Sequence, residues 1–372
     1  MPGREVFGEE EIQQVAEVLK TGVLFRYGFE DQRKGVFKVV QFEKEFAAYT
    51  GSLYALGVSS GTAALKTALK GLNLPEKTKV LTPCFTFVAT IESIEEAGLI
   101  PVLCEIDESL NISVQDIESQ IDKQTSAVLP VHMMGSACDM SGIMAASNQF
   151  NLPVIEDACQ ATGAEYKGKK LGTFGKYGCF SFDYVKVLTT GEGGMVVTDD
   201  EELYKQADWY HDHGHPHRSD VARGVEKRMR KGTNFRMNEM QGALGLAQIE
   251  KLPSIIKNHK KNKALIKQVL SRYDFIKFRK HYDEDGEIAT FLAFFLPDMK
   301  MAERFKEKMK ENSITPGIMN YWHFVANIES VQTNRQFEKS REILERMVVI
   351  DILIKMDAEK IADTLDKICK MF

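Results

Sequence analysis

The sequence lacks the patterns that mark several common classes of protein. Its six cysteines are scattered over 372 residues without a CxxC pair, so neither a zinc knuckle nor a redox dithiol is predicted. No apolar run is long enough to span a bilayer, and the start MPGREVFGEEE lacks the features of a signal peptide. The net charge of −5 gives no reason to expect nucleic acid or an anionic membrane as a partner. We therefore expect a cytoplasmic protein that acts on small molecules.

The middle of the chain predicts an α/β domain. Between about residues 54 and 199, short apolar runs alternate with helical patterns such as Thr62–Leu72 and Phe87–Glu96. Runs that are hydrophobic at nearly every position are typical of strands buried on both faces of a largely parallel sheet, whose ligands lie at the carboxyl ends of the strands. The expected strands are Tyr54–Ser59, Val80–Pro83, Ile100–Asp107, Ala127–His132, Pro153–Ala158, Gly178–Asp183 and Gly194–Thr198.

The last third of the chain has a different character. A long helical pattern begins at Glu239, and it is followed by an expected strand at Thr290–Leu296 and by expected helices at Met301–Asn312 and Ala358–Met371. We therefore predict a large α/β domain over residues 1–245, which includes the N-terminal segment, and a smaller α+β domain over residues 246–372.

A lysine in an unusual setting is the first candidate for chemistry. Lys186 follows an apolar run in FSFDYVKVL, where a solvated lysine is less expected. Apolar surroundings favour the neutral amine that a Schiff-base nucleophile requires. The glycines of Gly191-Glu-Gly-Gly194 let the backbone pass close to a ligand. They complete neither GxGxxG nor GxxxxGK[ST], so dinucleotide and P-loop functions lose support.

A carboxylate follows another apolar run. Asp157 stands in VIEDACQ, and at the end of a strand its side chain either points into the ligand crevice, caps a helix or lies at the surface. With Lys186 one strand later, the pair fits a pyridoxal cofactor, which draws electrons only while its ring nitrogen stays protonated.

Two strand-to-helix turns offer further contacts. In SSGTAAL, Gly61 leaves room for an anion near backbone N–H groups, although ordinary helix capping explains the motif equally well. Ser181 could supply a hydroxyl to the same anion. In PCFTFVAT, an aromatic ring either belongs to the core or stacks on a planar ligand.

Five motifs in this order resemble those of the DegT/DnrJ/StrS aminotransferases, which are fold-type-I pyridoxal-phosphate enzymes that mostly aminate ketosugars. The motifs are SSGTAAL, TPCFTFVAT, VIEDACQATGA, FSFDYVKVLTTGEGG and GTNFRMNEMQGALGLAQI. The resemblance covers about residues 5–255 closely and the C-terminal part loosely. It implies pyridoxal 5′-phosphate as cofactor, with pyridoxamine phosphate as the intermediate form, glutamate as amino donor and a homodimer as the active unit.

The resemblance also implies a role for each matching residue. Lys186 would form the Schiff base and shuttle the proton, Asp157 would hold the pyridine nitrogen, and Gln160 would contact the ring near its 3-oxygen. The phosphate would be bound by the backbone at Gly61 and Thr62 and by the hydroxyl of Ser181, and Phe87 would stack on the ring. Asn234 matches an asparagine that reaches the cofactor phosphate of the partner subunit.

A finer resemblance concerns the substrate. The stretches MPGREVFG, LFRYGF, WYHDHGH, VARG and YWH resemble family members that aminate the 8-aldehyde of a free 3-deoxy-octulosonate sugar acid. Arg26, Arg218 and Arg236 are candidates for contacts with the carboxylate of such a substrate, and a surface role is equally open for each. The alternative acceptor is a nucleotide-linked 3- or 4-ketosugar.

Two other functions have less support. In the sugar dehydratases of the family that the chain resembles, histidine stands at the position that matches Lys186. The lysine therefore argues against dehydration. A non-catalytic regulator on the same fold would have no need of Lys186. The alternating His211, His213, His215 and His217 could bind zinc or nickel, but Pro216 fits a loop and no second ligand pair is evident. We expect a substrate-proximal loop there and predict no metal site.

Overall fold

A computed structural model describes residues 3–218, 220–221, 223–317, 322–328, 331 and 333–372. Of the stretches that carry the finer resemblance, Met1, Pro2, Ala222 and Tyr321 lie outside the described residues. None of the helices in the described ranges combines the length and the apolar character that a bilayer crossing requires.

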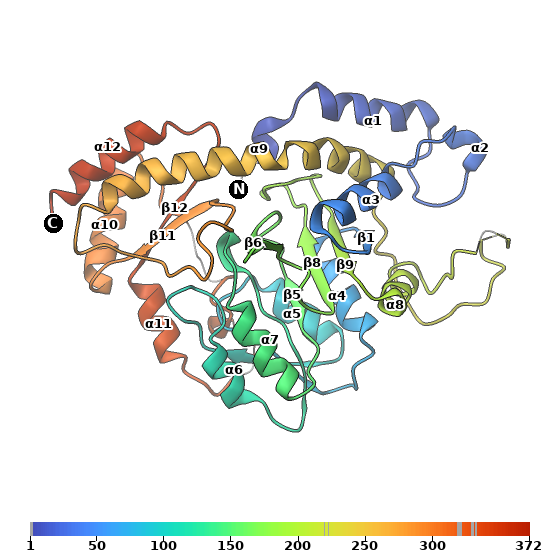
Figure 1. Ribbon diagram of the computed structural model, residues 1–372, viewed down its shortest axis with the longest axis horizontal. Helices are drawn as coiled ribbons and strands as arrows, with labels where there is room; N and C mark the ends of the chain where they lie inside the picture. The colour runs from blue at the N-terminus through green and yellow to red at the C-terminus, as the bar shows by residue number, and fades with distance from the viewer. Residues whose placement is uncertain (1–2, 219, 222, 318–321, 329–330, 332) are drawn as a thin grey trace.

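A mixed sheet forms the centre of the molecule (Figure 1). Its strands fall on the seven expected apolar runs, because these runs bury side chains on both faces. The hydrogen-bonded orders are β1-β9-β8-β5 and β3-β2-β4. Bridges between Val128 and Val154 and between Val131 and Asp157 join the two groups. The strands are β1 (Tyr54–Val58), β2 (Lys79–Pro83), β3 (Ile100–Cys104), β4 (Thr125–Val128), β5 (Ile155–Asp157), β8 (Tyr177–Ser181) and β9 (Gly194–Thr198).

Strand direction confirms the predicted mostly parallel sheet. β9 runs antiparallel to both of its neighbours, β1 and β8. The pairs β5–β8, β2–β3 and β2–β4 are parallel. The carboxyl ends of all strands except β9 therefore lie at one edge, where ligands of such sheets bind.

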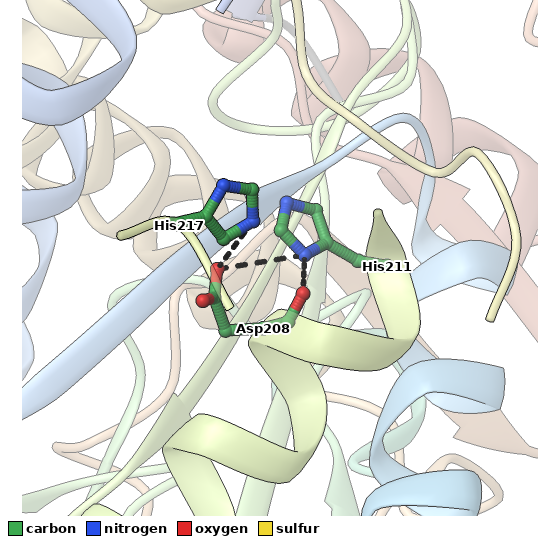
Figure 2. Close-up of side chains that lie close together, drawn as sticks. All are labelled: Asp208, His211 and His217. Atoms are coloured by element: carbon green, nitrogen blue, oxygen red, sulfur yellow. Dashed lines mark hydrogen bonds and ion pairs between the residues drawn. The ribbon is translucent and has the colours of Figure 1, made fainter. Parts of the chain in front are cut away.

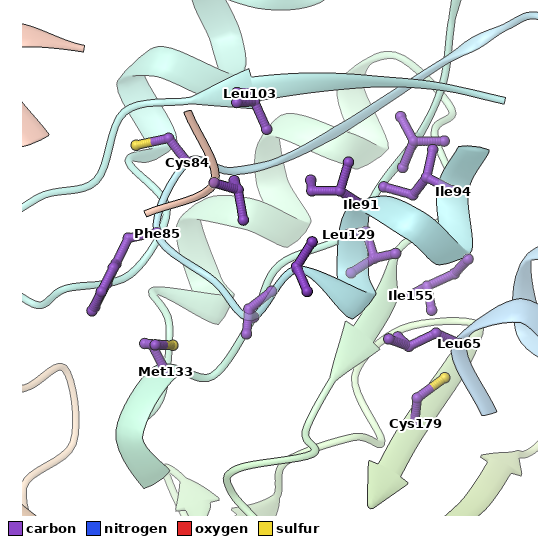
Figure 3. Packing of buried hydrophobic residues seen from close by; sticks show 14 of the residues in the cluster. Leu65, Cys84, Phe85, Ile91, Ile94, Leu103, Leu129, Met133, Ile155 and Cys179 are labelled. Carbon is purple, nitrogen blue, oxygen red and sulfur yellow. The ribbon is translucent and has the colours of Figure 1, made fainter. Parts of the chain in front are cut away.

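Helices cover both faces of the sheet and make it a three-layer sandwich. One core lies under α4 (Gly61–Gly71), α5 (Ala89–Glu96) and α8 (Glu201–His211), and Figure 3 shows Leu65, Ile91 and Ile94 packing there against Ile155 and Cys179. The opposite core lies under α3 (Lys38–Thr50), α6 (Val114–Gln120), α7 (Met140–Gln149) and the first half of α9 (Glu239–Leu270).

A smaller unit follows at the C-terminal end of the chain. Its antiparallel sheet has the order β10-β11-β12 and is covered by α10, α12 and the end of α9 around Ile266 and Leu270. The apolar run at the start of β12 gives this strand its buried residues. The elements are β10 (Lys277–Phe278), β11 (Phe291–Phe295), α10 (Met299–Glu311), α11 (Glu338–Glu345), β12 (Met347–Asp351) and α12 (Ala358–Cys369).

One helix belongs to both parts of the molecule. α9 has 32 residues, begins with a capping box between Asn238 and Gln241, and contains Pro253. α1 (Glu9–Thr21) packs on α9 near its start, and α12 packs on α9 near its end (Figure 1). The predicted division after residue 245 falls inside this helix. The remaining short elements are α2 (Glu30–Arg33), β6 (Glu165–Tyr166), β7 (Lys169–Lys170) and the 3-10 helices η1 (Gly3–Val6), η2 (Met133–Gly135) and η3 (Val325–Asn327).

Candidate active site

A cavity of about 120 Å³ lies at the carboxyl ends of β5 and β8 and at the amino end of α4. The residues that line it come from four separate motifs of the sequence, which the parallel strands bring to one edge of the sheet. Every cofactor residue implied by the resemblance lines it except Asn234. The lining includes Gly61, Thr62, Phe87, Asp157, Gln160, Ser181 and Lys186.

The amino end of α4 closes one side of this cavity. Ser60 caps the helix by accepting a hydrogen bond from the N–H of Ala63 at 3.0 Å. A Cβ atom on Gly61 would lie 2.7 Å from Cβ of Ser181 and 3.0 Å from its Oγ, so only glycine allows the helix start to approach the end of β8 this closely. The first N–H groups of a helix have no carbonyl partners within it, and here they stand beside a serine hydroxyl. This arrangement suits a phosphate.

Asp157 presents a buried carboxylate at the end of β5. Its Oδ2 accepts a hydrogen bond from Thr90 Oγ1 at 3.0 Å, and its Oδ1 accepts one from the N–H of Cys159 at 3.1 Å. Each oxygen therefore keeps lone-pair capacity for one more donor. Burial, followed by the Asp157 charge, holds the pKa of the Cys159 thiol well above its usual range.

The side-chain amide of Gln160 has a defined orientation. Its Oε1 accepts the N–H of Met134 at 2.9 Å, which fixes the amide orientation and leaves the NH₂ group to donate. The side chain is buried and lines the cavity, so an oxygen atom of a bound ring is the kind of partner that it can serve.

Lys186 lies in the loop between β8 and β9 and is half-buried, not inside an apolar strand end. Its own N–H donates to the carbonyl of Asp183 at 2.9 Å, and its carbonyl accepts the N–H of Gly3 at 3.0 Å, so both sides of the residue are held by backbone. The pKa of His323 is lowered by burial and by the nearby Lys186 charge.

A second cavity of about 480 Å³ adjoins the first. The two share Phe87, Gln160, Asp183 and Lys186 as lining residues. The second is also lined by residues of the N-terminal segment and of the smaller unit, among them Arg4, Phe291, His323 and Asp351. The His323 ring lies 5.6 Å from the Phe87 ring. This larger space is open to a substrate that would react beside Lys186.

Besides Lys186, Arg4 lines the second cavity, and its guanidinium lies 4.9 Å from the centre of the Tyr184 ring. The arginines considered from sequence have other partners within the chain and line neither cavity. Arg26 is buried against Glu43 at 2.6 Å, Arg218 pairs with Asp220, and Arg236 pairs with Asp212.

Asn234 does not line the first cavity, unlike the other residues for which the resemblance implies a cofactor contact. It is exposed, forms a bridge to Asp212, and accepts the N–H of Arg236 at 3.4 Å through Oδ1. Its predicted contact with a partner subunit stays a prediction.

Sequence reasoning missed Thr90, Arg4 and His323. Thr90 stands inside the TPCFTFVAT motif one helical turn after Phe87, and this spacing was a usable signal. Arg4 and His323 stand in the stretches MPGREVFG and YWH, but nothing in those stretches indicates that the two side chains line the site. They reach the site because Gly3 bonds to Lys186 and because the carbonyl of His323 accepts the N–H of Thr86 at 2.8 Å.

The chain is similar to known proteins over nearly its whole length. A model of the DegT/DnrJ/EryC1/StrS aminotransferase family matches residues 6–369. The GDP-perosamine synthase of Vibrio cholerae is 34% identical over 270 residues, which are 72% of this chain and 70% of that protein. The spore coat polysaccharide biosynthesis protein SpsC of Bacillus subtilis is 39% identical over 68% of this chain and 64% of its own.

The chain spans 57 to 64% of the lengths of the first curated relatives that it matches. Among solved structures, an aminotransferase from Psychrobacter cryohalolentis has 27% sequence identity and a TM-score of 0.87, with 98% of this chain and 97% of that chain covered.

Proposed function

Because the chain belongs to the DegT/DnrJ/EryC1/StrS aminotransferase family, we propose that it is an aminotransferase that carries the amino group of glutamate to a sugar carbonyl. The observation that carries this proposal is that Lys186 and the buried Asp157 line one cavity with the amino end of α4. A lysine, a carboxylate and an anion site are the three features that pyridoxal 5′-phosphate, the cofactor of this family, requires.

The residues present fit this cofactor. Its phosphate would be held by the first N–H groups of α4 and by Ser181, which the absence of a Cβ atom on Gly61 allows to lie close to the start of the helix. Its ring nitrogen would meet Asp157, its ring oxygen would meet the NH₂ group of Gln160, and its face would meet Phe87. When bound, the cofactor supplies a sink for the electrons left behind when a substrate C–H bond loses its proton.

The chain supplies positioning and proton transfer. Nζ of Lys186 would bond the cofactor and, once released from it, would take the proton from the α-carbon of the donor and later deliver a proton to the carbon of the acceptor. Asp157 would place its carboxylate beside the ring nitrogen and so hold the proton there. Thr90 and the N–H of Cys159 fix the orientation of that carboxylate.

For the acceptor we propose an octulosonate-type sugar acid with an aldehyde at carbon 8. The support is Arg4, a guanidinium in the cavity beside Lys186, because a carboxylate is best bound by a cation with several N–H donors. A nucleotide-linked 3- or 4-ketosugar is the second candidate, and it is favoured by the names of relatives such as GDP-perosamine synthase. Either acceptor fits a place in the biosynthesis of a surface polysaccharide.

We further propose a homodimer, in which Asn234 contacts the cofactor phosphate of the partner subunit. All six cysteines are free thiols, in keeping with the cytoplasmic location expected from the sequence.

Separate half-reactions test the function. Glutamate should convert the cofactor-loaded protein to the amine form, and a sugar acceptor should convert it back, with the visible absorbance falling and then returning. Lys186→Ala should block both half-reactions, while Lys20→Ala, an exposed lysine on α1, should block neither. Full activity of Lys186→Ala would overturn the assignment.

A comparison of kcat/KM for the sugar acid and for GDP-, UDP- and dTDP-linked ketosugars then decides the acceptor. A clear preference for a nucleotide-linked ketosugar would refute the sugar acid and leave the aminotransferase in place.

A further inference from the structure

A histidine and aspartate cluster lies at the carboxyl end of α8, outside both cavities. Asp208 and His211 are three residues apart and share one face of the helix, and His217 returns to them from the following loop (Figure 2). One nitrogen or oxygen atom from each of the three lies within 4.8 Å of the others.

The spacing of these atoms is too wide for hydrogen bonds. Oδ1 of Asp208 lies 3.6 Å from Nδ1 of His211 and 3.7 Å from Nε2 of His217. Oδ2 of Asp212 lies 3.5 Å from the same Nε2. Two ligands bound tetrahedrally to one zinc ion at their usual bond lengths stand about 3.3–3.4 Å apart, so the two separations from Asp208 need only a small contraction.

Two of these atoms lack a hydrogen-bond partner among the described residues. Oδ2 of Asp212 and Nε2 of His217 are buried and make no hydrogen bond to any described residue. Oδ1 of Asp212 already binds Arg223 at 2.7 Å and Arg236 at 2.5 Å. A buried donor or acceptor without a partner lowers stability, so a cation bound by Nε2 of His217 would be favourable.

The charged groups around the cluster are paired in part. Arg26 lies 2.6 Å from Glu43, and Asp212 binds both Arg223 and Arg236.

Tyr27 and the carbonyl of Asp208 orient the histidines. The Tyr27 ring stacks on the His217 ring with centroids 4.0 Å apart, and Oη of Tyr27 lies 3.0 Å from Nε2 of His211. Nδ1 of His211 also contacts the carbonyl of Asp208, which holds the ring proton in the metal-free state. A metal at Nδ1 would move that proton to Nε2, where Tyr27 accepts it.

We propose that Asp208, His211 and His217 form a structural binding site for a divalent transition metal, with zinc as the first candidate. Two histidines and a carboxylate are a ligand set that zinc takes readily. The metal would tie the loop that follows α8 to the helix itself.

The test uses the full-length holoenzyme made without a histidine tag. The protein is stripped with a chelator, loaded with excess Zn²⁺, gel-filtered and analysed for metal by mass spectrometry. Wild type should retain about one zinc ion per chain. His217→Ala and the isosteric Asp208→Asn should each weaken the affinity at least tenfold. His213→Ala is the matched control, because His213 belongs to the same loop but is exposed and stands outside the cluster.

A second readout does not depend on counting metal. Zinc should slow tryptic cleavage at Arg218 and Arg223 in wild type and in His213→Ala, but not in His217→Ala. The proposal is overturned if stripped wild type retains no stoichiometric zinc. It is equally overturned if His213→Ala and His217→Ala lose zinc to the same extent, since the ion would then be held elsewhere.

Discussion

Thr90 Oγ1 donates a hydrogen bond of 3.0 Å to Oδ2 of Asp157, and Thr86 Oγ1 lies 2.8 Å from the same Thr90 hydroxyl. The Asp157 carboxylate, which we assign to the cofactor ring, is therefore oriented in part by α5. Its other hydrogen bond comes from the N–H of Cys159, just after β5. Thr90 is a positioning residue, because it acts through Asp157.

Thr90→Val should lower the rate of both half-reactions about tenfold or more, as expected when a hydrogen bond to a charged group is lost. Thr90→Ser keeps the hydroxyl and should restore most of the rate, which a role in packing alone would not explain. Stopped-flow absorbance measures both. Equal rates for the Val and Ser variants would contradict this role.

Asp157→Asn should slow the reaction more strongly than Thr90→Val. The amide keeps the shape but loses the negative charge beside the ring nitrogen, and a lost preorganised contact of this kind costs about 10²–10³ in rate. Cofactor retention, read from absorbance after gel filtration, should be largely kept. A variant with the wild-type rate would remove Asp157 from the mechanism.

Arg4→Gln tests the sugar-acid acceptor. Loss of a charge-assisted contact to the carboxylate should raise KM for the sugar acid about 10- to 100-fold. The glutamate half-reaction should be unchanged. Arg304→Gln is the control, because Arg304 also lies over an aromatic ring, at 4.8 Å from the centre of Phe372, but in the smaller unit. A defect confined to the glutamate half-reaction would assign Arg4 to the donor instead.

Subunit mixing tests the role of Asn234. Asn234→Ala should weaken cofactor retention in every site, and Lys186→Ala should inactivate every site. In a hybrid dimer with sites shared across the interface, one site carries both changes and the other carries neither. Random mixing should therefore recover up to about a quarter of the wild-type activity. If each site used the Asn234 of its own chain, mixing would recover nothing.

Acid should destabilise the protein through His259, which is buried on α9. Burial lowers its pKa from 6.5 to about 4. The unfolded state takes up the proton first, so the stability from this group is complete above pH 6.5 and is lost as the pH falls towards 4. Between pH 7.5 and pH 5, wild type should lose about 2 kcal/mol more unfolding free energy than His259→Leu.

Urea unfolding at both pH values measures this difference. His213→Leu, which changes an exposed histidine, should follow wild type. Identical pH dependence in wild type and His259→Leu would refute the assignment to His259.

Local patterns predicted the sheet well, because strands buried on both faces must be apolar along their whole length. β2 and β8 are examples, with nearly every residue buried. The reversed direction of β9 was not predictable, since an antiparallel strand with two buried faces has the same apolar sequence as a parallel one. Helix α3 was also missed, because its apolar face at Val39, Phe42 and Phe46 is interrupted by charged residues.

The site was predictable where a motif stands at the end of a strand. Asp157 and Ser181 meet because β5 and β8 are parallel neighbours with a common edge. Arg4, at the far end of the chain, joins them only through tertiary packing, which no spacing in the sequence records. The same holds for Asp208 and His217, whose nearness depends on the path of a loop.

The continuity of α9 restricts how the enzyme can open and close. A helix of 32 residues is about 48 Å long, and it runs from beneath the large sheet into the core of the smaller unit. If the smaller unit moved as a rigid body, helix α9 would have to bend. It would bend most easily at Pro253, where a backbone hydrogen bond is missing. A substrate is therefore expected to reach the cavity beside Lys186 without a rigid swing of the smaller unit.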